Sequence, residues 1–385
     1  MSASASLAAP RPPLTAAHRA VAAVFFCNGL GFASWVSRIP AVRDALSLSE
    51  GELGTALFAL AAGAIAAFRL TPRGVDILGA RLLMLLAAAV YCLALPQPAL
   101  VGSLVSLAIT LFVFGAANGA VDVTMNALGV ELEHRAGRPV MSSLHGMWSA
   151  GGLSGALLGS LAAHQGLAPW LHLGLVALLL AAVLLVVRPA LPEAAAAPHD
   201  APPAAPRDPI LWLLGAMALF AFLVEGAMAD WSAVLLRDVL HTTEAVAPWG
   251  YAAFAVAMTG MRFAGDRLVA RFGPVGLLRT GNALAAVALG AALAFPSLPL
   301  MLAAFVCAGL SLAIVAPVVF ATAGRHGSTP SHAIGFVASI GYAGFLLGPP
   351  VIGWIATHAG LGGAFQVLVG LLVVLALLAG RLRGA

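Results

Sequence analysis

The amino-acid sequence predicts an all-α membrane protein whose twelve transmembrane helices form two pseudo-symmetric six-helix bundles. Of the 385 residues, 61% are hydrophobic and only 9% are charged, and the mean hydropathy of +1.00 is too high for a water-soluble chain of this length. Apolar runs of roughly 20 residues, the length that crosses a bilayer, recur twelve times. One long Pro/Ala-rich polar segment divides these runs into two groups of six.

The predicted spans are centred near residues 28, 60, 88, 112, 152 and 178, and then near 218, 254, 286, 310, 343 and 372. Helices are expected because lipid offers no partners to unpaired backbone groups, and the runs lack the alternation of barrel strands. Residues 1–16 lack the features of a removable signal, and we expect them to be a disordered tail. The predicted N-terminal bundle covers 17–189, a cytoplasmic linker covers 190–208 and the C-terminal bundle covers 209–385.

The distribution of charge predicts the orientation in the membrane. All nineteen basic residues are Arg, and a cytoplasmic N-terminus places all but Arg38, Arg43 and Arg237 on the cytoplasmic side. We therefore expect both termini in the cytoplasm. The net charge of +4 comes from scattered Arg residues, so nucleic acid is not an expected partner. The three cysteines lie far apart without CxxC spacing, so neither a disulfide nor a metal site is expected.

The two halves of the chain resemble each other. MWSAGGLSGALLGSLA (147–162) aligns with GYAGFLLGPPVIGWIA (341–356) at an offset of 194 residues. An Arg-Asp pair follows Trp35 in the first span and Trp231 in the seventh. Two parallel six-helix repeats are typical of transporters that move around a site at the membrane midplane.

Several motifs resemble the major facilitator superfamily over essentially the whole chain. VDILGAR (75–81) is similar to the family's loop signature, and GMRFAGDRLVARFG (260–273) is similar to its second copy. NGAVDVTMN (118–126) resembles the fourth-helix acidic motif of fucose-proton symporters. NGLGFASW, GRPVMSSLHGMWS, EGAMADWS and GYAGFLLGPP are similar to the MosC-like group of bacterial inner-membrane proteins.

This resemblance implies a multi-pass secondary active transporter of the bacterial inner membrane that works by alternating access. It further implies a small polar solute, such as a sugar, polyol or amino sugar, and protons as the coupling ion. We expect a monomer that interacts with the lipid bilayer and needs no cofactor.

Asp122 is the leading candidate for proton coupling. An ionisable group at membrane depth costs about 2.5 to 3.5 kcal/mol, so it should face the bundle interior or an aqueous cavity. Asn118, Asp122 and Asn126 follow one another at helical spacing and form one polar stripe, which makes the two amides candidate substrate-binding residues. The alternative is a structural carboxylate that is hydrogen-bonded between helices.

Glu225 and Asp230 form a second acidic pair in the seventh span. Their separation of five residues places them about 140° apart around a helix, so we expect that they do not both face one small site. Glu225 is predicted to be a second coupling acid. For Asp230, nearer the outer end, three interpretations stay open: substrate binding, a gate contact with Arg38, or a solvated position.

In the first span, Asn28, Trp35 and Arg38 recur on one helix face and are predicted to form a substrate-binding wall. The alternative is that Arg38 extends to the outer interface and Trp35 belongs to the aromatic belt.

In the fifth span, His145 is a candidate proton relay because an ordinary histidine titrates near pH 6.5, although such residues are also hydrogen-bonded near interfaces. Trp148, Trp231 and Tyr342 are further substrate-binding candidates. Charged residues and a glycine at helix ends in the two loop signatures are predicted to form a cytoplasmic gate: Asp76, Gly79, Arg81, Asp266, Arg267 and Arg271.

Several function classes are disfavoured. The chain has no GxxxxGK[ST] phosphate loop, so ATP is not the expected energy source, and it has no HExxH or GxSxG motif, so an enzyme is not expected. Two alternatives stay open: a proton antiporter that exports amphipathic drugs or metabolites, and a non-transporting membrane scaffold or sensor.

Overall fold

The structure is a computed structural model, and it describes residues 13–137, 140–193, 208–326 and 330–384. Every regular element in these ranges is a helix. The N-terminal bundle consists of α1 (Leu14–Val36), α2 (Ile39–Leu46), α3 (Glu50–Leu78), α4 (Ala80–Ala94), α5 (Leu104–Ala136), α6 (Met141–His164) and α7 (Pro169–Val187). The C-terminal bundle consists of α8 (Pro209–Leu240), α9 (Trp249–Phe272), α10 (Pro274–Ala294), α11 (Leu298–Leu312), α12 (Val315–His326) and α13 (Pro330–Ala379).

The helices account for the twelve predicted membrane crossings. In the described ranges, nine helical segments are long and apolar enough to span a membrane, with α11 and α12 together forming one of them. The segment that contains α13 supplies two crossings, because its backbone leaves the helical conformation at Gly360. The Gly- and Ser-rich α6 and the Arg-rich α9, with 24 residues each, complete the set of twelve. The predicted all-α fold is confirmed.

The two bundles repeat the same chain path at the offset of 194 residues that the sequence alignment indicates. Positive φ angles, which end helices or reverse the chain, occur at equivalent positions of the two halves. The pairs are Ser47 (51°) with His241 (50°), Gly79 (77°) with Gly273 (74°), and Gly166 (68°) with Gly360 (71°).

Small residues let the helices of each bundle approach closely. A Cβ atom added to Gly29 of α1 would meet the Trp148 carbonyl group of α6, and one added to Gly115 of α5 would meet the Leu60 carbonyl group of α3. Without water to drive apolar surfaces together, such backbone contacts supply much of the packing energy between membrane helices. The α1–α6 and α3–α5 pairs are thereby fixed side by side, and each pair places residues at the boundary between the bundles.

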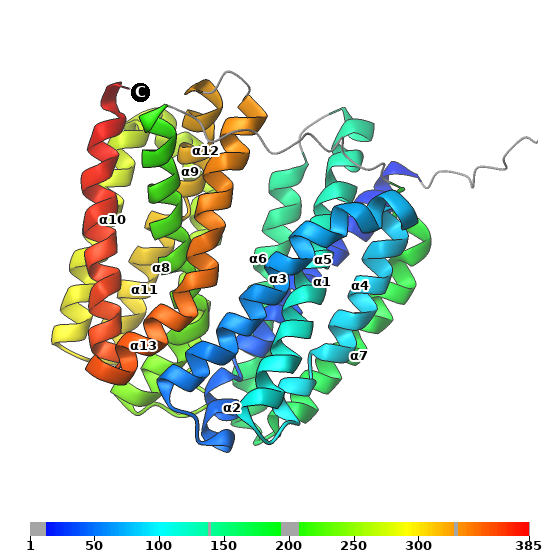
Figure 1. Ribbon diagram of the computed structural model, residues 1–385, viewed down its shortest axis with the longest axis horizontal. Coiled ribbons are helices and arrows are strands. Elements are labelled where there is room, and N and C mark those ends of the chain that lie inside the picture. Colours follow the sequence, from blue (N-terminus) through cyan, green and yellow to red (C-terminus); the bar gives the residue numbers. More distant parts are fainter. Residues whose placement is uncertain (1–12, 138–139, 194–207, 327–329, 385) are drawn as a thin grey trace, which may run out of the picture.

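Figure 1 shows the two bundles side by side, converging at the end of the molecule that carries α2 and standing further apart at the other end. We call these the α2 end and the termini end, because α1 begins and α13 finishes at the latter. The predicted tail falls mostly outside the described residues, and its last residues, 14–16, already belong to α1. Most of the predicted linker also lies outside the described residues.

Candidate functional site

A cavity of about 230 Å³ lies between the two bundles. Its wall comes from α1, α3, α5 and α6 of one bundle and from α8, α9 and α13 of the other. Most of the lining side chains are aliphatic or aromatic. The residues with polar atoms in the wall are Asn118, Trp148, Ser149, Glu225, Asp230, Tyr251 and Tyr342.

Asn28 orients two residues of this wall. The buried Asn28 amide donates to Asn118 Oδ1 over 2.9 Å and accepts from Trp148 Nε1 over 2.8 Å. Its backbone carbonyl accepts from the Tyr91 hydroxyl over 2.9 Å. Because Asn118 accepts through its oxygen, its NH₂ group is turned away from Asn28 and can donate to a molecule in the cavity. Asn28, a predicted substrate-binding residue, is thus connected to the cavity through Asn118 and Trp148.

Glu225 and Asp230 both line the cavity. The expectation that they do not share one small site is therefore wrong. Five residues advance a helix by about 7.5 Å, and the cavity extends along more than one turn of α8, so the angular separation does not exclude either side chain. Glu225 lies 3.6 Å from the Arg262 guanidinium group of α9. Tyr251 lies within electrostatic range of both carboxyl groups.

Asp122 lies one helical turn beyond Asn118, toward the termini end of α5. Asn126 Nδ2 donates to Asp122 Oδ1 over 3.2 Å and to the Asp122 backbone carbonyl over 2.8 Å. The Asp122 side chain is partly exposed, and it lies within electrostatic range of the Tyr342 hydroxyl group. Asp122 is absent from the set of residues that line the cavity, so the structure places it beside the cavity rather than in its wall.

His145 lies on α6 near the termini end and is exposed. Its ring packs edge-on against Phe25 at a centroid distance of 5.3 Å. Arg262 of the other bundle lies within electrostatic range of this imidazole. Arg262 therefore interacts with Glu225 in the cavity and is within electrostatic range of His145 on the facing bundle.

Arg38 and Trp35 lie outside the cavity wall. Helix α1 ends at Val36 and the chain turns into α2, which directs the fully buried Arg38 toward the α2 end. There its guanidinium group donates to Glu244 over 2.8 Å, to the Leu167 carbonyl over 2.8 Å and to His172 Nδ1 over 3.2 Å. The proposed contact between Arg38 and Asp230 is replaced by this pairing with Glu244. Trp35 and Trp231 are fully buried in the bundles, and neither lines the cavity.

Two crossed ion pairs join the bundles at the α2 end, and we call them the charge clasp: Arg43 with Asp238, and Arg237 with Asp44. Arg43 donates to both carboxylate oxygens of Asp238, through Nη2 over 2.7 Å and also through Nη1. Arg237 donates to Asp44 over 2.7 Å. The two Arg-Asp pairs are repeat equivalents, 194 residues apart, so the pseudo-twofold relation of the bundles brings each arginine to the aspartate of the other half.

Glycines also close the α2 end. Gly54 of α3 lies against Gly353 and Pro349 of α13, where an added Cβ atom would come within 2.7 Å of the Pro349 carbonyl oxygen. The Ser160 hydroxyl of α6 donates to the Ala245 carbonyl between α8 and α9. Backbone contacts and polar pairs therefore hold the bundles together at this end.

The predicted gate residues lie at the termini end. Gly79 forms the sharp break between α3 and α4, and Arg81 donates to the Arg188 carbonyl over 3.0 Å and to Glu193 over 3.4 Å, at the start of the predicted linker. Arg267 is exposed, and Arg271 lies over the Phe272 ring at 5.2 Å. Asp76 makes an interaction within the protein, and the Asp266 side chain lies outside the described part of the structure.

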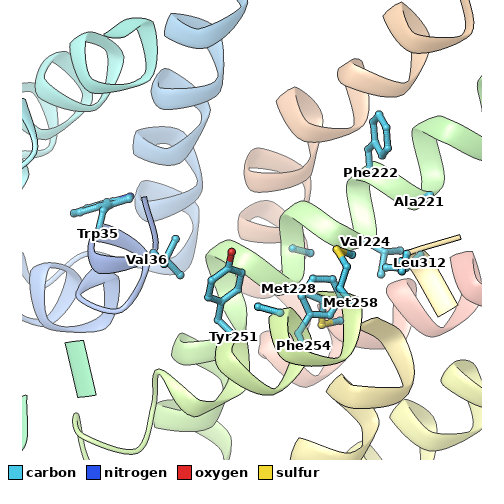
Figure 2. Close-up of a cluster of buried hydrophobic side chains, with 14 of the residues drawn as sticks. Trp35, Val36, Ala221, Phe222, Val224, Met228, Tyr251, Phe254, Met258 and Leu312 are labelled. Carbon is cyan, nitrogen blue, oxygen red and sulfur yellow. The ribbon is translucent and has the colours of Figure 1, made fainter. Parts of the chain in front are cut away.

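The sequence interpretation missed Tyr251, Ser149 and Glu244. In Figure 2, Tyr251 appears between Trp35 and Val36 on one side and Phe254 and Met258 on the other. Only three tyrosines occur in the chain, and the position of Tyr251 inside a predicted span was the available signal. Glu244 lies in a loop, where local sequence carries no sign of a partner 206 residues away.

Comparisons with known proteins agree with the motifs. The Major Facilitator Superfamily model matches residues 21–265 and 228–384. An uncharacterized MFS-type transporter of Yersinia pestis is 36% identical over 91% of this chain and 92% of its own length. The membrane protein MosC of Rhizobium meliloti is 33% identical over 93% of this chain and 88% of its own length.

Two solved structures share the fold at low sequence identity. An aspartate-to-alanine mutant of the nucleoside transporter NupG superposes with a TM-score of 0.78 at 14% identity, and the match covers 95% of this chain and 99% of the NupG chain. A D-xylose-proton symporter superposes with a TM-score of 0.76 at 15% identity, covering 95% and 97%. The family model and the relatives, together with the helices and the internal repeat of this protein, show that this chain is a transporter of the Major Facilitator Superfamily.

Proposed function

We propose that this protein is a secondary transporter that moves a small polar solute together with protons (symport) across the bacterial inner membrane by alternating access. In this proposal both termini are cytoplasmic and the monomer is the working unit. The two moving bundles are residues 17–189 and 209–385, and the linker of residues 190–208 connects them. The α2 end is then the outer end, so the structure corresponds to an inward-facing state.

The observation that carries the proposal is the cavity between the bundles. Seven helices from both halves contribute to its wall, so any change in the angle between the bundles changes access to it. The contacts that close the α2 end are ion pairs, a hydrogen bond and glycine contacts, all of which can separate without disrupting either bundle. A non-transporting scaffold would not require a cavity with two carboxyl groups at this boundary.

The proposed coupling acids are Asp122 and Glu225. A carboxylate charge is costly in an apolar cavity, and protonation removes that cost. Protonation of Glu225 also removes its attraction for Arg262, which lies beside His145 of the facing bundle. Proton binding at Glu225 would thereby change the electrostatic interaction between α6 and α9, which is a route from protonation to bundle movement. Asp122 lies within electrostatic range of Tyr342 in the cavity wall.

The test is uptake into proteoliposomes under an imposed proton gradient, with neutral sugars, polyols and amino sugars as solutes. We expect Asp122→Asn to abolish gradient-driven uptake and to leave solute exchange across the membrane in place, because exchange needs no net proton movement. Glu131→Gln, a change to a carboxyl group outside the cavity wall, is the matched control and should retain both activities. Fully coupled uptake by Asp122→Asn would remove Asp122 from this role.

A second candidate is proton antiport of amphipathic molecules, and the aromatic and aliphatic character of the cavity wall favours it. Uptake into the same proteoliposomes, measured with the proton gradient imposed in each direction, distinguishes symport from antiport. Symport is driven by protons that move with the solute, whereas antiport is driven by protons that move against it. The proposed symport fails if solute accumulates only when the proton gradient opposes its movement.

A further inference from the structure

The cavity wall combines aromatic rings with acidic groups. Seven of its lining residues are aromatic, and they come from five helices of both bundles: Phe32, Phe68, Trp148, Tyr251, Phe254, Tyr342 and Phe345. The faces of such rings carry negative electrostatic potential and attract a cation that lies over them. Flat rings also cover the apolar faces of a ring-shaped solute.

The charges around the cavity do not balance. Glu225 faces Arg262 at 3.6 Å, whereas Asp230 has no basic partner in the part of the chain that the structure describes. Asp122, just beyond the wall, is bound to the neutral Asn126 amide.

Three other arginines at the bundle boundary are already engaged. Arg38 pairs with Glu244, Arg43 with Asp238 and Arg237 with Asp44, all at the closed α2 end. None of these arginines belongs to the cavity wall. Among the described residues, the cavity wall therefore carries two carboxyl groups and no basic side chain, and the nearby Arg262 is paired with Glu225. A low-dielectric site of this kind favours a positively charged occupant.

We propose that the cargo is a protonated amine with a ring-shaped or apolar body, and that Asp230 binds its ammonium group. This inference rests on the proposed function, because it assumes that the cavity is the transport site. Asp230 is the group assigned to the cargo because a cation at Glu225 would compete with Arg262. Tyr251 lines the same cavity and is within electrostatic range of both acids. The Asn118 amide provides a donor on the opposite wall for a hydroxyl or ether oxygen of the same molecule.

The test uses matched pairs of amines and their hydroxyl equivalents: phenethylamine with 2-phenylethanol, and glucosamine with glucose. Binding to the purified full-length protein in nanodiscs is measured by thermal stabilisation and by calorimetry at pH 7, where both amines are protonated. A charge-assisted hydrogen bond in a buried site should make at least one amine bind roughly tenfold or more tightly than its hydroxyl partner.

Three variants assign this preference to Asp230. Asp230→Asn should remove the preference for the amine, Asp230→Glu should retain it, and Glu131→Gln should leave it unchanged. A thermal unfolding transition of each ligand-free variant close to that of the unmodified protein shows that the fold is retained. The inference is overturned if the hydroxyl compounds bind as tightly as the amines, if neither amine binds, or if Asp230→Asn keeps the preference.

The proposed function is tested separately by transport. Gradient-driven uptake of glucose or another neutral solute that does not depend on Asp230 would contradict the amine inference and support the proposed transporter. Tight binding of the amines without any movement of solute in proteoliposomes would contradict the transporter and leave the binding site in place.

Discussion

Gly353 of α13 lies against the start of α3 at the α2 end, where the bundles are in closest contact. A Cβ atom at this position would lie 2.6 Å from the Glu50 carbonyl oxygen and 2.9 Å from the Gly54 Cα atom. Both neighbours are backbone atoms and cannot move aside by a change of rotamer. We therefore expect Gly353→Ala to destabilise the arrangement that is closed at the α2 end.

The size of the effect follows from comparing the two states of the transporter. Alanine is favoured over glycine in a helix by roughly 0.5 to 1 kcal/mol, but this gain applies in both states and cancels from their ratio. Overpacking costs about 1 to 3 kcal/mol and applies only where α3 and α13 touch. The ratio of the open to the closed α2 end should therefore rise by roughly 5- to 150-fold.

Distances between spin labels measure this ratio. Labels at cysteines that replace the exposed Ala45 and Thr243, one in each bundle at the α2 end, report its opening in a background without the native cysteines. Gly335→Ala, on the same helix with no atom within 4 Å of the added Cβ atom, is the matched control. An unchanged distance distribution in Gly353→Ala, relative to Gly335→Ala, would refute the reasoning.

Two further predictions concern contacts within and between the bundles. Arg43→Asp should weaken the charge clasp by about 1 kcal/mol and favour opening of the α2 end. Adding Asp238→Arg should restore the spin-label distance of the closed α2 end, because the reversed ion pair joins the same two positions. The charge clasp has no role in closure if, in the same spin-label measurement, the double variant changes the ratio of open to closed α2 end by the sum of the free-energy effects of Arg43→Asp and Asp238→Arg alone. Asn28→Ala should lower the thermal stability of the purified protein and weaken solute binding by roughly tenfold or more, since it leaves Asn118 and Trp148 without their partner. Unchanged binding in a folded Asn28→Ala protein would show that Asn28 does not organise the cavity wall.

Local properties of the sequence determined the fold. The length and apolarity of each run predict a membrane helix wherever it lies in the chain, because each crossing must satisfy its backbone hydrogen bonds internally. The 194-residue repeat is equally visible in the letters, and it reappears in the backbone as matched positive φ angles such as those of Gly79 and Gly273. The motifs that resemble the major facilitator superfamily likewise predicted the family that the comparisons confirm.

The tertiary structure alone decided which polar groups meet. Helical spacing suggested that Glu225 and Asp230 face different surroundings, but one cavity spans more than a turn of α8 and includes both. Helical spacing left Arg38 either on a cavity wall or at the outer interface, whereas the turn after α1 carries it to Glu244, 206 residues away. Such contacts depend on how the two bundles are placed against each other, and spacing along one helix contains no information about that placement.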